Sequence, residues 1–192
     1  MQLLEERIRR DGKVLPGNVL KINSFLNHQV DPALMMVLGT EFAKRFKDSG
    51  VTKILTCEAS GIAPAVMAGY QLNVPVIFAR KKQPSTIDAA TYTAPVASYT
   101  KGVTNTICVE QQFLPRGEQV LIIDDFLARG EAVKGMASIT KQAGCSVVGI
   151  GVVVAKNFQG GTAWVKAHDY PLESLATISN FAGNQVHFEG EA

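Results

Sequence analysis

Two adjacent acids, Asp124 and Asp125, follow a short apolar run in residues 119–132, QVLIIDDFLARGEA. An apolar run without polar alternation is typical of a strand buried on both faces of a parallel sheet. The two carboxylates are therefore predicted at the carboxyl rim of an open α/β sheet, where such sheets bind ligands. At that rim they could hold sugar hydroxyls, directly or through Mg²⁺.

The turn after the acids predicts an anion site. It consists of Ala128, Arg129, Gly130, Glu131 and Ala132, and apolar residues at helical spacing begin immediately after it. A strand–turn–helix junction presents free backbone N–H groups and the positive end of a helix dipole, which together bind phosphate. Acids for ribose beside a phosphate site indicate ribose 5-phosphate chemistry. The structural alternative is a strand that merely happens to end in two acids.

A second strand–turn–helix junction is predicted at residues 53–72, where residues 53–57 form the strand. Its turn begins with Glu58, Ala59, Ser60 and Gly61. We interpret these four residues as a second anion loop, because the chain contains another loop of the same kind. Lys81 follows the next predicted strand within a triplet of cations, where it could neutralise a diphosphate.

The polar stretch after this triplet predicts a lid. Residues 83–103 are rich in Thr, Ser and Ala, give weak signals for secondary structure, and contain the pair Ser98 and Tyr99. Long loops in compact domains tend to cover functional sites.

The remaining elements are predicted from apolar spacing and from helix caps. A helix begins at Asp31 and Pro32 and ends before Gly50, with an apolar face for the core. This face consists of Leu34, Val37, Leu38, Phe42 and Phe46. Residues 106–109 are expected to pair with the strand before Asp124, and residues 145–155 to form another central strand. Residues 162–192 are expected to form a terminal hood rather than another βα unit.

Composition excludes several classes of protein. The chain has 192 residues, 46% hydrophobic content and a net charge of +2, which is too small to indicate nucleic-acid binding. Its three cysteines form no C-x-x-C pair, and no apolar stretch has the length of a membrane span. The first ten residues, MQLLEERIRR, lack the apolar region of a signal peptide. We expect a cytoplasmic protein with no membrane or nucleic-acid partner.

The acids and the loop after them resemble the fingerprint of the type I phosphoribosyltransferases. In that family the loop usually carries Thr or Ser near its end, where Glu131 and Ala132 stand here. Four segments, VLKINSFLNHQVDP, CEASGIAPA, DDFLARGEA and VVVAKNFQGG, extend the resemblance over nearly the whole chain, to bacterial members that use xanthine. It implies one α/β domain of residues 1–192, a mainly parallel sheet flanked by helices, and a small hood from about residues 1–30 and 156–192.

The resemblance also implies a reaction and its residues. Such enzymes transfer the phosphoribosyl group of 5-phospho-α-D-ribose 1-diphosphate to xanthine, giving xanthosine 5′-monophosphate and diphosphate, as Mg²⁺-using cytoplasmic homodimers of purine salvage. By position, Leu20, Asn27 and Lys156 would bind the base, and residues 128–132 the 5-phosphate. Residues 58–61 and Lys81 would hold the diphosphate beside the catalytic acids, under a lid that contains Ser98 and Tyr99. The Lys156 ammonium is only a donor, which suits a carbonyl oxygen of the base.

Two alternatives remain open on the sequence. The base could be guanine or hypoxanthine. The chain could also be a regulator that senses phosphoribosyl diphosphate without catalysis. A DNA-binding regulator would normally add a further domain, and an RNA-binding relative would need a basic face that the net charge does not indicate.

Overall fold

A six-stranded sheet forms the centre of the protein. The computed structural model describes residues 1–81, 90–98 and 103–191. The sheet order is β10-β9-β8-β7-β3-β4, in which only β10 runs antiparallel to its neighbour. The strands are β3 (Lys53–Cys57), β4 (Val76–Ala79), β7 (Gln119–Leu127), β8 (Ser146–Lys156), β9 (Leu172–Ala182) and β10 (Gln185–Phe188). The expected mainly parallel α/β fold is confirmed.

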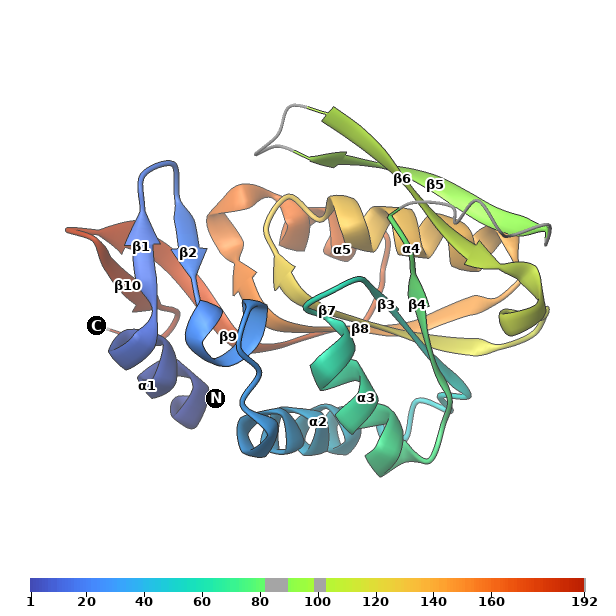
Figure 1. Cartoon of the computed structure of the whole chain (residues 1–192), viewed down its shortest axis with the longest axis horizontal. Coiled ribbons are helices and arrows are strands. Elements are labelled where there is room, and N and C mark those ends of the chain that lie inside the picture. The colour runs from blue at the N-terminus through green and yellow to red at the C-terminus, as the bar shows by residue number, and fades with distance from the viewer. Residues whose placement is uncertain (82–89, 99–102, 192) are drawn as a thin grey trace.

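Helices cover both faces of this sheet (Figure 1). On one face lie α2 (Pro32–Phe46) and α3 (Ile62–Leu72), and on the other lie α4 (Glu131–Gln142) and α5 (Gly161–Ala167). A separate antiparallel ribbon of β5 (Thr91–Ser98) and β6 (Val103–Glu110) lies over α4. A 3₁₀ turn, η2 (Gln111–Phe113), leads from the ribbon towards β7.

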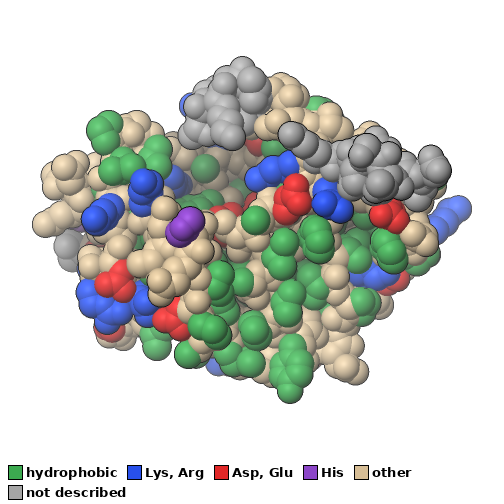
Figure 2. Space-filling view, viewed as in Figure 1, with side chains coloured by type: hydrophobic (Ala, Val, Ile, Leu, Met, Phe, Trp, Pro, Cys, Tyr) green, Lys and Arg blue, Asp and Glu red, His purple; other side chains and the backbone are tan. Residues whose placement is uncertain are grey.

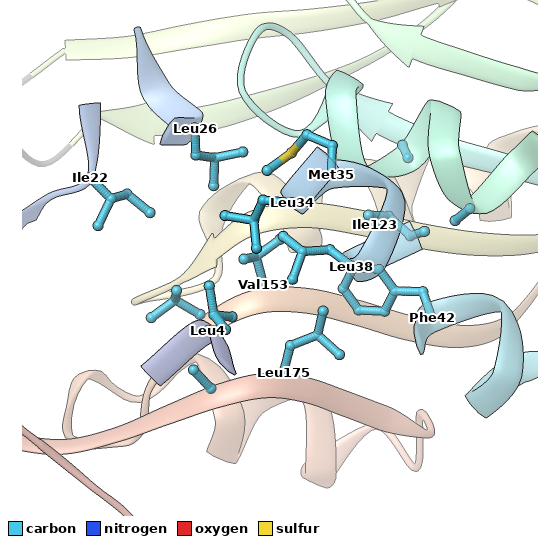
Figure 3. Packing of buried hydrophobic residues seen from close by; sticks show 14 of the residues in the cluster. Leu4, Ile22, Leu26, Leu34, Met35, Leu38, Phe42, Ile123, Val153 and Leu175 are labelled. Atoms are coloured by element: carbon cyan, nitrogen blue, oxygen red, sulfur yellow. The ribbon is translucent and has the colours of Figure 1, made fainter. Parts of the chain in front are cut away.

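The core has two halves, because side chains alternate across each central strand. In β7, Leu121 and Ile123 point into the cluster under α2 and α3, whereas Val120 and Ile122 point into the cluster under α4. Figure 3 shows Ile123 and Val153 of the sheet against side chains of α2. All four β7 side chains are fully buried, as predicted for a strand covered on both faces.

The two ends of the chain lie side by side (Figure 1). Residues 1–31 contain α1 (Gln2–Asp11), a hairpin of β1 (Lys13–Leu15) and β2 (Val19–Lys21), and the π-helical turn η1 (Asn23–Asn27). Helix α1 contacts β9 and β10 through a buried face that includes Leu4 and Ile8. The hairpin and η1 bury Leu20, Ile22 and Phe25 in the core cluster under α2 and α3.

Helix α2 begins as predicted. The carboxylate of Asp31 accepts a hydrogen bond from the backbone N–H of Leu34 at 3.1 Å, and Pro32 occupies the first helical position. Four of the five apolar side chains assigned to its core face are buried, but Val37 is 42% exposed. Val37 lies in an open groove between α1 and α2 rather than in the core, so the prediction for Val37 is wrong.

The predicted partner of residues 106–109 is also wrong. They belong to β6, which pairs antiparallel with β5 over eight positions from Thr91↔Glu110 to Ser98↔Val103. The strand β7 pairs instead with β3 and β8. Strand β5 occupies residues 91–98, so that part of the expected lid is a strand, and residues 82–89 and 99–102 lie outside the described residues.

The expectation that residues 162–192 contain no further βα unit is wrong as well. Helix α5 follows β8 through the 3₁₀ turn η3 (Asn157–Gln159), and β9 then pairs parallel with β8. This crossover extends the parallel sheet by one strand before β10 turns back. In the described part of the chain, no helix has the length and apolar composition needed to cross a membrane.

Candidate active site

The two acids lie near the carboxyl end of β7 in different surroundings. Asp124 is 5% exposed and accepts a hydrogen bond from the backbone N–H of Asp125 at 3.0 Å. Asp125 accepts from the backbone N–H of Phe126 at 3.0 Å and is only partly buried. Burial raises the pKa of the Asp124 carboxyl well above its ordinary value, and the Asp125 charge raises it further.

Both acids line a cavity of about 430 Å³, which we call the acid pocket. Its walls come from the ends of β3, β4 and β7, from the start of α4 and from the ribbon. They are formed by Cys57, Glu58, Ala59, Ser60, Lys81, Val96, Ala97, Asn105, Ile107, Asp124, Asp125, Phe126, Glu131 and Ala132. Parallel strands end at one rim, so residues far apart in sequence meet in this pocket.

Three residues of the predicted diphosphate loop, Glu58, Ala59 and Ser60, line the acid pocket together with the two acids. Glu58 accepts a hydrogen bond from the backbone N–H of Lys81 at 2.7 Å, which ties the loop to the end of β4. This contact places Lys81 at the same cavity as Ala59 and Ser60. Burial raises the pKa of the neighbouring Cys57 thiol to about 12, so this thiol is not a ready nucleophile.

The predicted phosphate loop, residues 128–132, joins β7 to α4. Gly130 precedes the helix with φ of +81°, a conformation that favours glycine. The backbone N–H of Gly161 donates to the carbonyl oxygen of Ala128 at 2.9 Å, and a Cβ at Gly161 would lie 2.6 Å from that oxygen. The absence of a Cβ at Gly161 therefore allows the start of α5 to pack against the backbone of the phosphate loop.

A second cavity of about 500 Å³ lies beside this loop, and we call it the phosphate-loop pocket. It is lined by Gly17, Asn18, Val19, Ala97, Phe126, Ala128, Arg129, Gly130, Glu131, Ala132, Val133, Lys156 and Gln159. It shares Ala97, Phe126, Glu131 and Ala132 with the acid pocket. One ligand could therefore occupy both cavities, with a phosphate at α4 and its reacting centre near the acids.

Lys156, the last residue of β8, lines the phosphate-loop pocket and contacts the hairpin. Its ammonium donates to the backbone carbonyl oxygen of Asn18 at 2.9 Å and lies 5.3 Å from the centroid of the Phe126 ring. Burial lowers the pKa of Lys156, and the Asp125 charge opposes that shift. A donor between a carbonyl and an aromatic ring can bind a carbonyl oxygen of a planar base.

Three predicted residues are not among the residues that line these cavities. Leu20 is buried in the core, and Gly61 and Asn27 line neither cavity. The side-chain amide of Asn27 instead donates to the Asp125 carboxylate at 2.6 Å. Of the predicted lid pair, Ser98 ends β5, and Tyr99 lies outside the described residues.

The sequence analysis missed several residues of the site. Asn18 and Val19 bring the hairpin to the phosphate-loop pocket, and Phe126 separates the two cavities. Phe126 follows the acids directly, and period-two alternation along β7 could have indicated that it faces away from Leu127. No local signal indicates that the backbone of Asn18 meets Lys156, because the two residues lie 138 positions apart.

The chain belongs to the phosphoribosyltransferase family. The family model described as "Phosphoribosyl transferase domain" matches residues 30–187, which include both anion loops and both acids. The protein is similar over its full length to enzymes named for one base. The xanthine phosphoribosyltransferase of Lactobacillus gasseri is 67% identical over 191 residues, and that of Ligilactobacillus salivarius is 56% identical, with each alignment covering 100% of both chains.

Solved structures share the fold at low sequence identity. The adenine phosphoribosyltransferase of Rhodothermus marinus has a TM-score of 0.75 and 21% identity, and covers 93% of this chain and 100% of its own. The enzyme of Trypanosoma brucei, solved with AMP, pyrophosphate and ribose-5-phosphate, has a TM-score of 0.71 and 20% identity, with coverage of 91% and 79%. These likenesses establish the fold.

The raised pKa of Asp124 predicts that this acid destabilises the fold at neutral pH. Folding must take up a proton or bury a charge, so the free energy of unfolding falls as pH rises from the unfolded pKa through the raised folded pKa. Asp124→Asn keeps the shape without the charge, and should raise that free energy at pH 7. The gain should disappear near pH 3, where the wild-type carboxyl is neutral in both states.

Thermal and urea unfolding at the two pH values measure this effect. Asp11→Asn is the control, because hydrogen bonding to Arg10 lowers the pKa of Asp11. Its loss of charge should therefore lower the free energy of unfolding at pH 7 instead of raising it. An Asp124→Asn protein that is less stable than wild type at pH 7 would contradict the assigned cost of burial.

Proposed function

We propose that the protein transfers the phosphoribosyl group of 5-phospho-α-D-ribose 1-diphosphate to xanthine, giving xanthosine 5′-monophosphate and diphosphate in purine salvage. The observation that carries this proposal is the pair of adjoining cavities, with one anion loop in each and the two acids beside their shared wall. The full-length relatives that are named for xanthine support the choice of base.

The proposed reaction separates charge at the anomeric carbon of the ribose. The bond from this carbon to the diphosphate oxygen breaks, a bond to a ring nitrogen of xanthine forms, and the base loses its proton. Asp124 and Asp125 would hold ribose hydroxyls, and their negative charge would stabilise the positive charge that develops on the ribose. The loop at residues 58–61 and Lys81 would receive the leaving diphosphate. The protein acts by placing two reactants in line, and no side chain serves as a nucleophile.

The acid pocket fits Mg²⁺ brought by the diphosphate. Among the described residues there is no cluster of three or more metal-ligating side chains. Mg²⁺ usually keeps several waters and is held by one or two carboxylates together with substrate phosphates. Asp124 and Asp125 are two such carboxylates, at the same cavity as the diphosphate loop. Bound there, Mg²⁺ would neutralise charge on the diphosphate.

We assign the 5-phosphate to residues 128–132, where α4 presents its free backbone N–H groups. We assign the base to the side of the phosphate-loop pocket that contains Lys156, with Asn27 and Leu20 as the further base residues. Phe126 offers the base an aromatic face between the two cavities. Ser98 and Tyr99 remain the proposed lid residues, and residues 1–30 and 156–192 the proposed hood of a single domain.

Turnover with several bases tests the function directly. With phosphoribosyl diphosphate and Mg²⁺, the purified protein should form xanthosine 5′-monophosphate, and kcat/KM should be higher for xanthine than for guanine, hypoxanthine or adenine. Chromatography of the nucleotide products and a coupled assay for diphosphate measure both. A higher kcat/KM for guanine would overturn the choice of base. Calorimetric binding of phosphoribosyl diphosphate without turnover of any base would indicate a sensor instead.

Lys156→Ala should separate base recognition from the rest of catalysis. Without the ammonium, an oxygen of the bound base loses its donor, and an unpaired buried polar group costs roughly 1–3 kcal/mol. We therefore expect kcat/KM for xanthine to fall about tenfold to a hundredfold. The variant should also discriminate less against adenine, which carries an amino group.

Binding of phosphoribosyl diphosphate alone, measured by calorimetry, should hardly change in Lys156→Ala. Lys166→Ala is the matched control, because Lys166 is an exposed lysine of the neighbouring helix α5. Equal losses of base-dependent activity and of diphosphate binding would mean that Lys156 supports the whole site rather than recognising the base.

We also propose a cytoplasmic homodimer. Apolar side chains gather over α2, α3 and the edge strand β4 in Figure 2. Strand β4 is followed by Arg80 and by Lys81, which lines the acid pocket. These apolar side chains include Met36, Val37, Val66, Tyr70 and Phe78, and Phe113 lies across a groove from β4. The unpaired cysteines, Cys57, Cys108 and Cys145, suit a reducing compartment.

A charge placed on this apolar face should separate the subunits. In a two-fold interface the same patch occurs on both subunits, so Val66→Asp introduces two charges at once. Wild type should sediment with twice the chain mass of 20.6 kDa. Val66→Asp should sediment with the mass of a single chain. Leu15→Asp, an exposed apolar position on the hairpin, should sediment like wild type. A Val66→Asp protein that stays dimeric would place the interface elsewhere.

A further inference from the structure

The phosphate loop carries a carboxylate at a place where it would repel a bound phosphate. Glu131 is the first residue of α4, and it lines both the acid pocket and the phosphate-loop pocket. It is the one acid among the described residues that line the phosphate-loop pocket. A carboxylate accepts hydrogen bonds and donates none, so Glu131 cannot replace the hydroxyl donor of a Thr or Ser. Its negative charge instead opposes the attraction of the helix N-terminus for an anion.

Lys134 offsets this charge. Its ammonium donates to Oε1 of Glu131 at 2.6 Å, the short distance of a charge-assisted hydrogen bond. The lysine stem lies close to the loop, since a Cβ at Gly130 would lie 3.8 Å from Lys134 Cε. Side chains of a helix lean towards its N-terminus, so Lys134 can reach back to the residue that begins α4.

The Glu131–Lys134 pair matters more for the charge of the site than for the stability of the fold. The two side chains are 31% and 34% exposed, and pairs of this spacing and exposure stabilise a helix only slightly. Lys134 is not among the residues that line either cavity, whereas Glu131 lines both. The effect of Lys134 on a bound ligand therefore passes through Glu131.

We propose that Lys134 sets the charge of the 5-phosphate site: by neutralising Glu131, it allows a phosphate dianion to bind the backbone N–H groups of residues 128–132. This role rests on the proposed function, in which that loop receives the 5-phosphate. The backbone contacts of the loop stay as assigned, and Lys134 is a further residue beyond them. The role also explains how a loop with Glu131 in place of a hydroxyl residue can accept a phosphate.

Lys134→Met tests this role, because it removes the charge and keeps a side chain of similar length. Calorimetry with ribose 5-phosphate should give a Kd about fivefold to tenfold higher than in wild type, since the unpaired Glu131 carboxylate then repels the phosphate. In steady-state kinetics the KM of phosphoribosyl diphosphate should rise by a similar factor, with kcat and the KM of xanthine unchanged. Sodium chloride at about 1 M should reduce the difference, because it screens charges beyond roughly 3 Å.

Two further variants isolate the charge of Lys134. Lys134→Arg keeps the charge and should bind ribose 5-phosphate like wild type. Lys141→Met is the matched control, because it removes an exposed lysine from the last turn of the same helix and changes the net charge equally. It should also bind like wild type. Circular dichroism and thermal unfolding establish that each variant is folded.

A double variant separates charge compensation from direct contact with the phosphate. Glu131→Gln removes the charge that Lys134 offsets, and alone it should bind ribose 5-phosphate at least as tightly as wild type. Glu131→Gln combined with Lys134→Met should therefore restore Kd to within about twofold of wild type, because the two residues act as a unit. A double variant as weak as Lys134→Met would overturn charge compensation and indicate that the ammonium contacts the phosphate itself.

The remaining outcomes separate this role from the proposed function. A wild-type Kd in Lys134→Met, with normal turnover of xanthine by the wild-type protein, would overturn the role of Lys134 and leave the proposed function intact. Wild-type protein that binds ribose 5-phosphate but turns over no base would overturn the proposed function, and the ratio of the two Kd values would still decide the role of Lys134. Wild-type protein that does not bind ribose 5-phosphate would overturn the assignment of the 5-phosphate, and the role of Lys134 with it.

Discussion

The parallel alignment of β3, β7 and β8 is the constraint on which the site depends. Their register, with Ile54 beside Leu121 and Leu121 beside Gly149, brings the carboxyl ends of the three strands to one rim. Each strand then delivers one group: the loop at residues 58–61, the two acids, and Lys156. Alternate side chains of these strands are buried in the two core clusters. A shift of one residue in the register would move each side chain into the other cluster and disrupt the packing of both. Burial of apolar surface thus also determines the spacing of the functional groups.

Elements that are buried on both faces could be predicted from the sequence, because continuous apolar runs and helix caps are local signals. The strands β3, β7 and β8 are buried on both faces, and the cap at Asp31 indicated the start of α2. The ribbon of β5 and β6 was recognised only at residues 106–109, since the rest of its Thr-rich strands resembles a polar loop and the pairing of the two strands is a non-local property. The strand β9 was missed for a related reason: its polar residues, such as Glu173 and Ser174, weaken the buried-strand pattern.

The same distinction applies to the site. Asp124 and both anion loops follow directly from a strand and the turn after it, and they line the cavities as expected. Contacts between segments that lie far apart in the sequence could not be predicted in this way. The carbonyl of Asn18 meets Lys156, and Asn27 meets Asp125, only because the N-terminal turn packs on the sheet. Leu20 is buried in the core, while its neighbour Val19 lines the cavity.

The packing of α1 on β9 and β10 has a consequence for how the protein folds during synthesis. Residues 2–11 leave the ribosome long before residues 172–188, which cover Leu4 and Ile8. Until then the apolar face of α1 has no partner from the C-terminal strands. Contacts of such sequence separation form slowly, because a long loop must close before they contribute any stability. Docking of the two ends is therefore a late event in biogenesis, and a nascent chain that lacks β9 leaves α1 available to chaperones.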